Sequence, residues 1–376
     1  MTTARLMIAA SEHDADMLYI SGMFVPDPFV AIGIGGLWHG LFSPLEVDRA
    51  RKQSRFDEVH LDSEWRQQGE RQGRDSTLAG AAAAFLAARN IRKLQVAGHF
   101  PVALANKLAG WGFEVSCTEG SLFPERAIKS EAEIRHIARA ERLTRRAMQQ
   151  AEQYLAACGI GNDGILTTPD RSRKVKSADV RRVIESFLIG EGAMPSHTIV
   201  ACGREAADPH NVGHGHIRAR QPIIVDIFPR LLDSGYWGDM TRTYVKGKAS
   251  ERVRELYRTV REGQDIGLSM VAAGVDGMLI HQAITAHFDQ CGFVTGNRRG
   301  KQVGFFHGTG HGVGLEVHEA PRISTRSDIL QAGQVVTVEP GLYYPDLGGV
   351  RLEDMVVVRA KGCDNLTRHA RRLEIE

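Results

Sequence analysis

IIVDIF at residues 223–228 and GDMTRTYV at 238–245 predict two β-strands joined by a turn, and VVTVEP at 335–340 with RLEDMVVV at 351–358 repeats the pattern. In each unit one acid lies in the first run and another in the returning run, 13 residues later in the first unit and 14 in the second. An acid inside an apolar strand is unfavourable unless a cation or a hydrogen-bond donor neutralises it. We therefore expect one shared site for divalent cations, built from Asp226, Asp239, Glu339 and Glu353.

A histidine between the two units is a fifth candidate ligand. The stretch HGTGHGVGLEVHE at 307–319 contains His307, His311 and His318. Its glycines disfavour a helix, and the following HEAPR does not match the HExxH pattern of helical zinc peptidases. We expect a glycine-lined strand or loop that brings the backbone close to the site. His311 is the predicted ligand, whereas His307 is a candidate for supporting the site and binding substrate, or for a purely structural role.

Strand alternation predicts how the acids meet. If the strands of the first unit pair, Asp226 and Asp239 face the same side of the sheet. Two carboxylates so placed repel each other or share a proton unless cations neutralise them. Four carboxylates and one imidazole suit two ions of Mn, Co, Fe or Zn better than one tetrahedral structural zinc. Taken singly, an acid such as Asp226 has an alternative interpretation as a turn or surface residue.

The composition indicates a globular protein with two domains. The 376 residues are 43% apolar and 24% charged, and such a length exceeds one ordinary core. The formal net charge of +2 argues neither for a nucleic-acid-binding protein nor for an acidic surface, and we expect no nucleic-acid partner. Five singly placed cysteines argue against a disulfide framework. The first residues lack the apolar core of a signal peptide and no run is long enough to span a bilayer, so we expect a cytoplasmic protein without membrane attachment.

A domain boundary is predicted between residues 125 and 126. Residues 1–125 alternate short strand-like and helical runs, among them an Ala-rich helix at 78–88, which favours an α/β domain with its own sheet. Residues 126–376 are predicted to form an α+β domain. Its first helix begins with a capping box of Ser130 and Glu133.

The second domain shows an order of elements that occurs twice. Ser250 and Asp276 are predicted to cap two further helices. The order helix, helix, acidic hairpin occurs twice, which suggests an internal duplication. We expect the two hairpins to join into one sheet backed by helices. The four helices are expected near 130–158, 178–189, 251–273 and 277–290.

These residues resemble the creatinase/prolidase/methionine aminopeptidase family of metallopeptidases. The resemblance covers about residues 123–359 and rests on four motifs in the family's order, VDIF…GDMTRTYVKG, HGTGHGVGLEVHE, TVEPGLYY and GGVRLEDMVVV. It implies a pita-bread catalytic domain at 126–376 and, at 1–125, the extra N-terminal domain of the prolidase and creatinase branches. A homodimer is implied as well.

The resemblance also implies a role for each candidate residue. Asp226 would bind one metal ion, and His311 with Glu339 the other, while Asp239 and Glu353 would bridge the two. Glu339 would also accept a proton from the bridging water, and His210 and His318 would contact the substrate and the oxyanion. Two cations about 3.5–4 Å apart lower the pKa of such a water and polarise a carbonyl, so that hydroxide attacks it. Thr241 and Arg351 would hold the carboxylates in place.

Arg322 decides the predicted substrate. In HEAPRIS it resembles the prolidase arginine that binds the C-terminal carboxylate of a dipeptide, a group that an arginine fork suits well. We therefore expect an Xaa-Pro dipeptidase that acts on short proline-containing peptides, with Xaa-Pro aminopeptidase, acting on longer peptides, as the alternative. A surface arginine after a proline turn is the structural interpretation of Arg322.

Other classes of protein make different predictions. A hydrolase of the creatinase kind needs no metal and departs at the ligand positions, and a catalytically silent binding protein on this scaffold typically loses ligands, whereas all five are present here. One departure from the family concerns the first turn, IFPRLLDSGYWG, which is about two residues longer than usual. We expect it to reshape the substrate entrance through Tyr236 and Trp237.

Overall fold

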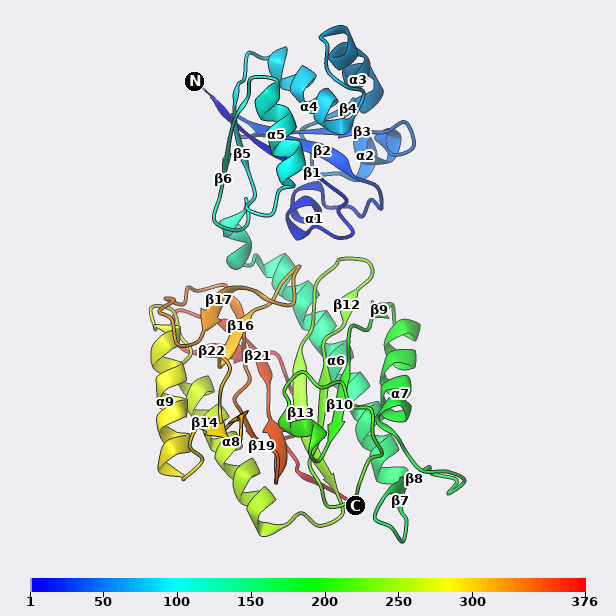
Figure 1. Ribbon diagram of the computed structural model, residues 1–376, viewed down its shortest axis with the longest axis vertical. Coiled ribbons are helices and arrows are strands. Elements are labelled where there is room, and N and C mark those ends of the chain that lie inside the picture. The colour runs from blue at the N-terminus through cyan, green and yellow to red at the C-terminus, as the bar shows by residue number, and fades with distance from the viewer. Residues whose placement is uncertain (1) are drawn as a thin grey trace. The chain divides into compact units, whose positions relative to one another are not determined.

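The chain divides into two units in this computed structural model, which describes residues 2–376. The first unit ends at Arg126 and the second runs Ala127–Glu376. Figure 1 colours both along the chain. Within the described residues, no helix has both the length and the apolar character that crossing a bilayer requires.

The first unit is a six-stranded mixed sheet flanked by helices. Its strand order is β4-β3-β2-β1-β5-β6, with β1 antiparallel to β2 and parallel to β5, and β3 parallel to β4. The predicted Ala-rich helix is confirmed as α4, whose side chains are almost all buried. The elements are β1 (Thr3–Ala9), α1 (Ala15–Ser21), β2 (Phe29–Ile34), β3 (Leu37–Phe42), α2 (Val47–Gln53), β4 (Glu58–Leu61), α3 (Asp62–Arg71), α4 (Leu78–Ala87), β5 (Lys93–Val96), α5 (Val102–Gly110) and β6 (Glu114–Cys117), followed by the 3-10 helix η1 (Pro124–Ala127).

The four predicted helices of the second unit are present, and the three predicted caps are confirmed. Ser130, Ser250 and Asp276 each accept a hydrogen bond from a backbone N–H of the first turn, and Glu133 completes the capping box. The third helix ends earlier than expected, because Val271 already has an extended backbone. The helices are α6 (Glu131–Ala157), α7 (Ser177–Gly190), α8 (Glu251–Met270) and α9 (Gly277–Gln290).

Two sheets carry the two predicted hairpins. In the sheet β10-β11-β13-β23, β11 (Ile223–Ile227) pairs antiparallel with β13 (Met240–Lys246). In the sheet β17-β16-β18-β21-β22, β18 (Val335–Val338) pairs antiparallel with β21 (Asp354–Val358). The other elements are β7 (Gly159–Ile160), β8 (Leu166–Thr167), β9 (Ala193–Met194), β10 (Ile199–Cys202), η2 (Glu205–Ala207), β12 (Arg230–Leu231), β14 (Gly296–Arg298), β15 (Lys301–Val303), β16 (Gly310–Gly312), β17 (Glu319–Ile323), β19 (Gly341–Tyr344), β20 (Gly348–Arg351), β22 (Cys363–Asn365) and β23 (Glu374–Ile375).

The prediction that the hairpins join into one sheet is wrong. Where they meet, the Thr243 hydroxyl donates a hydrogen bond to the Arg351 carbonyl (2.9 Å) and accepts one from the Arg351 N–H (3.1 Å). A side-chain hydroxyl thus replaces a backbone partner and interrupts the ladder. A backbone hydrogen bond from Glu353 N–H to the Thr241 carbonyl (3.1 Å) still ties the two hairpins together.

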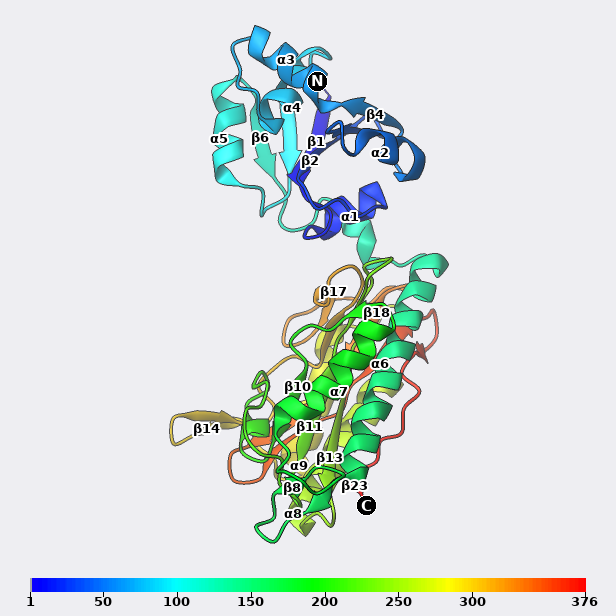
Figure 2. The ribbon, with the colours of Figure 1, turned by 90° about the vertical axis from the view of Figure 1, so that its right-hand side faces the viewer.

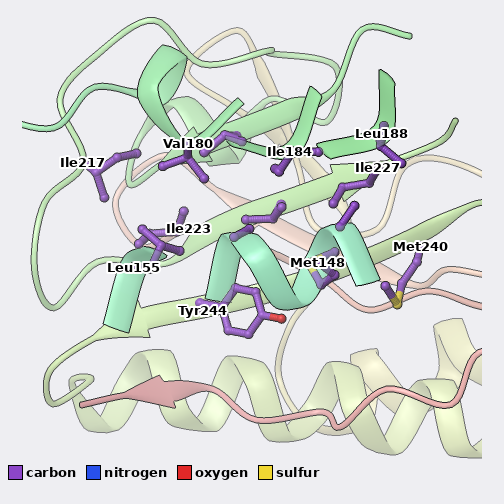
Figure 3. Packing of buried hydrophobic residues seen from close by; sticks show 14 of the residues in the cluster. Met148, Leu155, Val180, Ile184, Leu188, Ile217, Ile223, Ile227, Met240 and Tyr244 are labelled. Carbon is purple, nitrogen blue, oxygen red and sulfur yellow. The ribbon is translucent and has the colours of Figure 1, made fainter. Parts of the chain in front are cut away.

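Each sheet buries one face under a pair of helices. Figure 2 shows α6 and α7 side by side over β10 and β11. In Figure 3, Met148 and Leu155 of α6 and Ile184 of α7 lie against Ile223 and Ile227 of β11. A second apolar cluster joins α8 and α9 to β18, β19, β20 and β21. These two cores fix the backbone at the strand ends that carry the predicted ligands.

Candidate metal and catalytic site

The five predicted ligands come together at one cavity of about 610 Å³. The fold achieves this because each ligand stands in a strand or directly at a strand end. All five line the cavity: Asp226 lies in β11, Asp239 immediately before β13, His311 in β16, Glu339 immediately after β18 and Glu353 immediately before β21.

Glycines on both sides of His311 bring its strand close to the site. A Cβ atom on Gly310 would lie 1.9 Å from the Thr337 carbonyl oxygen, and one on Gly312 would lie 2.1 Å from that of Ala320. No side chain fits at either position, so the glycines of the predicted stretch permit the close pairing of β16 with its neighbours. The expectation of a strand rather than a helix is confirmed.

The imidazole of His311 points its Nε2 at the carboxylates. Its Nδ1 lies 3.2 Å from the Gly312 carbonyl oxygen, to which it donates, and this leaves the Nε2 lone pair free. Nε2 is 3.4 Å from Oε1 of Glu339 and 3.8 Å from Oδ2 of Asp239. One potential ligand atom each of Asp239, His311 and Glu353 lies within 4.8 Å of the others. Asp226 adds a buried oxygen, Oδ1, for which the described part of the chain supplies no hydrogen-bond donor.

Three acids of this cluster, Asp239, Glu339 and Glu353, have a raised pKa. Burial, followed by repulsion from neighbouring carboxylates, raises the pKa of Asp239 and the pKa of Glu339 well above their ordinary values. Burial and the charge of Asp226 raise the pKa of Glu353 to about 8. Burial lowers the pKa of His311 to about 3, so its ring is neutral, which is the form that binds metal. The donor set, its convergence and the unpaired oxygen of Asp226 therefore fit divalent cations.

Arg351 and Thr241 fix the orientation of two of these acids. Arg351 donates from Nη2 to Oδ2 of Asp226 (2.7 Å) and from Nε to the Thr241 hydroxyl (3.2 Å). Thr241 in turn donates to Oε2 of Glu353 (2.8 Å). The arginine thereby leaves the other oxygen of Asp226 facing the cavity.

Tyr343 is a site residue that sequence reasoning missed. Its hydroxyl accepts a hydrogen bond from Nη1 of Arg351 (2.9 Å) and lies 2.9 Å from Nε2 of His307. Since Nδ1 of His307 faces the Gly308 carbonyl oxygen at 2.7 Å, Nε2 is the acceptor and the tyrosine is the donor. His307, which lines the cavity, is thus connected to Asp226 through Tyr343 and Arg351. The motif TVEPGLYY contains this tyrosine but does not reveal its partners.

Removing the Tyr343 hydroxyl is expected to weaken both stability and catalysis. Tyr343→Phe leaves Nε2 of His307 without a buried partner and leaves Nη1 of Arg351 with only the Pro209 carbonyl (3.3 Å), which costs about 1–3 kcal/mol of unfolding free energy. The matched control is Tyr344→Phe, which removes a hydroxyl that donates to the Val294 carbonyl (3.2 Å) outside the cavity. Urea unfolding measures the loss of stability in both variants, and kcat measures the loss of catalysis. The control should leave kcat unchanged. Equal losses of kcat in the two variants would contradict a role of Tyr343 in the site.

Glu141 is a second residue that was missed. It lies in α6 among the buried positions Ile137, Thr144 and Met148, and its side chain is fully buried. It accepts hydrogen bonds from the backbone N–H of Asp239 (3.1 Å) and from Thr367. An acid at a position that helical periodicity assigns to the buried face was the signal that could have found it.

The buried acids predict how the metal-free protein responds to pH. Burial raises the pKa of Glu141 to about 8, as it does for Glu353, from an ordinary value of 4.5. Between these values the folded protein binds more protons than the unfolded chain, so its stability falls as pH rises from about 4.5 to 8. We expect the melting temperature of chelated protein to be lower at pH 8 than at pH 6 by about 4 °C or more, since each kcal/mol lost lowers it by about 2–4 °C.

Calorimetry of chelated and metal-loaded samples checks this expectation. Bound cations favour the ionised form of Glu353, so the loaded protein should lose only the stability that Glu141 contributes over the same interval. A chelated protein that is equally stable at both pH values would contradict the clustering of unneutralised acids.

His210, His318 and Arg322, which like His307 are predicted to contact substrate, also line the cavity. The rings of His318 and His311 meet edge to face with centroids 4.3 Å apart, and burial lowers the pKa of His318. His210 is exposed on the loop before β11. Arg322 is exposed in β17, and within the described residues its guanidinium has no hydrogen bond or ion pair. Each is therefore free to bind a ligand in the cavity.

The expectation for Tyr236 and Trp237 is wrong, because neither lines the cavity. The Tyr236 hydroxyl donates to Oε1 of Glu133 (2.8 Å), its ring stacks on His136 of α6, and Trp237 donates to the Leu315 carbonyl (3.0 Å). The longer turn is therefore anchored on α6 and on the loop after β16. The aromatic side chains at the cavity are those of Phe228 and Phe306.

The sequence of this chain is similar to those of known peptidases. Residues 135–360 match the model of metallopeptidase family M24. An uncharacterized peptidase of Bacillus subtilis is 32% identical over 273 residues, which are 70% of this chain and 74% of that protein. The Xaa-Pro dipeptidase of Pyrococcus furiosus is 33% identical over 230 residues, 60% of this chain and 63% of the dipeptidase, so the match spans less than two thirds of its length.

A solved structure shows the same fold. The X-Pro aminopeptidase from Thermotoga maritima superposes with a TM-score of 0.83, covering 100% of this chain and 98% of the other. Because the two sequences are 23% identical, this likeness concerns the fold alone.

Proposed function

The chain belongs to metallopeptidase family M24, and from this membership we propose that it hydrolyses the peptide bond preceding proline in short peptides. The observation that carries the proposal is the convergence of Asp226, Asp239, His311, Glu339 and Glu353 on one cavity. A protein that only binds peptides has no need to bury four acids beside one neutral imidazole, since such burial lowers stability until cations neutralise it.

The five ligands would hold two divalent cations. When bound, such a pair polarises the scissile carbonyl and makes a water acidic enough to attack near neutral pH. We propose that Asp226 would bind one cation and that His311 and Glu339 would bind the other. Asp239 and Glu353 would be ligands of both. Mn, Co, Fe and Zn all accept this donor set.

Glu339 is the proposed proton carrier. Its side chain is 19% exposed, against 6% for that of Asp239, so it is the more accessible of these two acids. A carboxylate at the cavity surface can take a proton from the attacking water and pass it to the leaving amine. His210 and His318 line the cavity, and we propose that their N–H groups donate hydrogen bonds to substrate and to the oxyanion that forms at the carbonyl.

Arg322 favours a dipeptidase within this class. Its guanidinium faces the cavity without a partner in the described part of the chain, and a fork of N–H donors binds a carboxylate through two hydrogen bonds. The C-terminal carboxylate of an Xaa-Pro dipeptide is the group that would occupy it. Xaa-Pro aminopeptidase activity on longer peptides is the second candidate, the alternative that the sequence resemblance leaves open.

Hydrolysis of a matched pair of peptides, Ala-Pro and Ala-Pro-Ala, tests the proposal. The chelated protein is loaded with Mn²⁺ or Co²⁺, and release of the N-terminal alanine from both peptides is compared with cleavage of Ala-Ala under the same conditions. We expect Ala-Pro to be cleaved fastest. Preferred cleavage of Ala-Pro-Ala would assign an aminopeptidase, and equal cleavage of Ala-Ala would contradict proline specificity.

A further inference from the structure

A second cluster of possible metal ligands lies in the first unit. It consists of His39 in β3 and of Glu58 and His60 in β4, each offering one ligand atom within 4.8 Å of the others. The two strands are parallel, and His39 stands opposite Glu58 in their register. Residues two apart on a strand share a face, so His60 lies on the same side as Glu58. The pairing of β3 with β4 therefore gathers all three side chains on one face of the sheet.

The spacing of the three atoms matches one face of a zinc tetrahedron. Oε2 of Glu58 is 3.2 Å from Nδ1 of His39 and 3.2 Å from Nε2 of His60, and the two nitrogens are 3.5 Å apart. Zinc bonds of about 2.0–2.1 Å at tetrahedral angles separate neighbouring ligand atoms by about 3.3–3.4 Å. One ion could therefore contact all three atoms with little movement of the side chains.

Hydrogen bonds among these three side chains leave a conflict that one bound cation would remove. Both nitrogens approach the same carboxylate oxygen, so each needs a hydrogen to donate to it. The two N–H groups would then crowd each other at the 3.5 Å separation of their nitrogens. If one nitrogen gave up its hydrogen, its lone pair would face the carboxylate instead. A single divalent ion accepts a lone pair from each atom and removes this conflict.

The surroundings suit a metal site with limited exposure to water. His39 is buried and His60 half-buried, and both rings lie 5.1 Å from the ring of Phe85, with Trp65 beside His60. An apolar floor of this kind holds imidazole ligands in place and restricts solvent. The Glu58 side chain is 50% exposed, so the open side of the triangle faces solvent and leaves room for a water as fourth ligand.

We propose that Nδ1 of His39, Nε2 of His60 and a carboxylate oxygen of Glu58 form a binding site for one Zn²⁺, separate from the cavity of the second unit. Three protein ligands with one open position are an established zinc arrangement. Because β4 is the edge strand of its sheet, the ion links this edge to β3. The expected effect of the ion is to stabilise the first unit by joining these two strands.

Metal content of the full chain tests the proposal. Parent protein and His60→Gln are chelated, equilibrated with excess Zn²⁺, desalted and analysed for zinc per chain. We expect His60→Gln to hold one equivalent less than the parent, however many ions the other site holds, so the result does not depend on the proposed function. The matched control is His13→Gln, an exposed histidine of the same unit, which should hold as much zinc as the parent.

A second variant, Glu58→Gln, keeps the proposal testable if His60→Gln does not fold. Glu58→Gln preserves the shape of an exposed side chain, and we expect it to bind the ion about tenfold or more weakly in competition with a chromophoric chelator, since even indirect partners of a metal contribute about 10- to 100-fold in affinity. Zinc should raise the melting temperature of the parent more than that of either variant. Equal zinc content in parent and His60→Gln, or unchanged affinity in Glu58→Gln, would overturn the proposal.

Discussion

Replacing Glu339 with glutamine is expected to lower kcat for Ala-Pro hydrolysis by about 10²–10⁴-fold, the range that general acid–base catalysis contributes. Glutamine keeps the size of the side chain and one oxygen that can bind a cation, but it cannot accept a proton. Because the substrate contacts proposed for His318 and Arg322 remain, KM should change little. The measurement is steady-state hydrolysis at saturating Mn²⁺ with circular dichroism as a check of folding.

The matched control for Glu339 is Asp226→Asn. Asp226 has no proposed part in proton transfer, so Asp226→Asn should weaken metal binding and the ion pair with Arg351 without removing the proton carrier. Raising the Mn²⁺ concentration should then recover most of the activity of Asp226→Asn and none of that of Glu339→Gln. Recovery of both variants by metal would mean that Glu339 is a ligand and nothing more.

Arg322→Ala is expected to reduce kcat/KM for Ala-Pro by about 10- to 100-fold, which corresponds to the loss of a hydrogen-bonded charge pair of about 1.5–3 kcal/mol. For Ala-Pro-Ala the reduction should be much smaller, because the carboxylate of the tripeptide lies one residue further from the scissile bond. The ratio of the two kcat/KM values therefore measures how much Arg322 contributes to binding the dipeptide carboxylate.

Two variants sharpen the Arg322 experiment. Arg326→Ala removes an exposed arginine that does not line the cavity and should leave both peptides unaffected. Arg322→Lys keeps the charge but not the fork, so it should retain part of the dipeptide preference. Equal losses for dipeptide and tripeptide in Arg322→Ala would show that the arginine does not bind the dipeptide carboxylate.

The sequence was sufficient to predict the family and the elements that have strong local signals. Membership of family M24 is confirmed by the match over residues 135–360. The helix starts at Ser130, Ser250 and Asp276 were predictable because a capping side chain acts on its own first turn. Strand alternation likewise placed Asp226 beside Asp239, since pairing of neighbouring strands follows from the chain itself.

Contacts between distant parts of the chain could not be predicted in this way. The prediction of a single sheet was wrong at Thr243, where the side-chain hydroxyl forms hydrogen bonds with the backbone of Arg351. Tyr343 was missed because its role depends on Arg351 and His307 meeting at its hydroxyl. The turn with Tyr236 was assigned to the entrance although α6 binds it. In each case at least one deciding partner lies 36 or more residues away in sequence.

The cluster in the first unit illustrates the same point. His39 and His60 carry no spacing that indicates a metal pair, and Glu58 belongs to an unremarkable polar run. Only the parallel pairing of β3 with β4 brings them together. Parallel partners are joined by long connections, so their register is not evident from a single sequence.

Titration of chelated His60→Gln with Mn²⁺, followed by hydrolysis of Ala-Pro, tests the central claim most directly. In this variant the cluster in the first unit cannot bind an ion through His60, so any response belongs to the cavity of the second unit. The account predicts no hydrolysis without metal and a rise that reaches its plateau at two equivalents per chain. Hydrolysis by the metal-free protein, or none at any Mn²⁺ concentration, would contradict it.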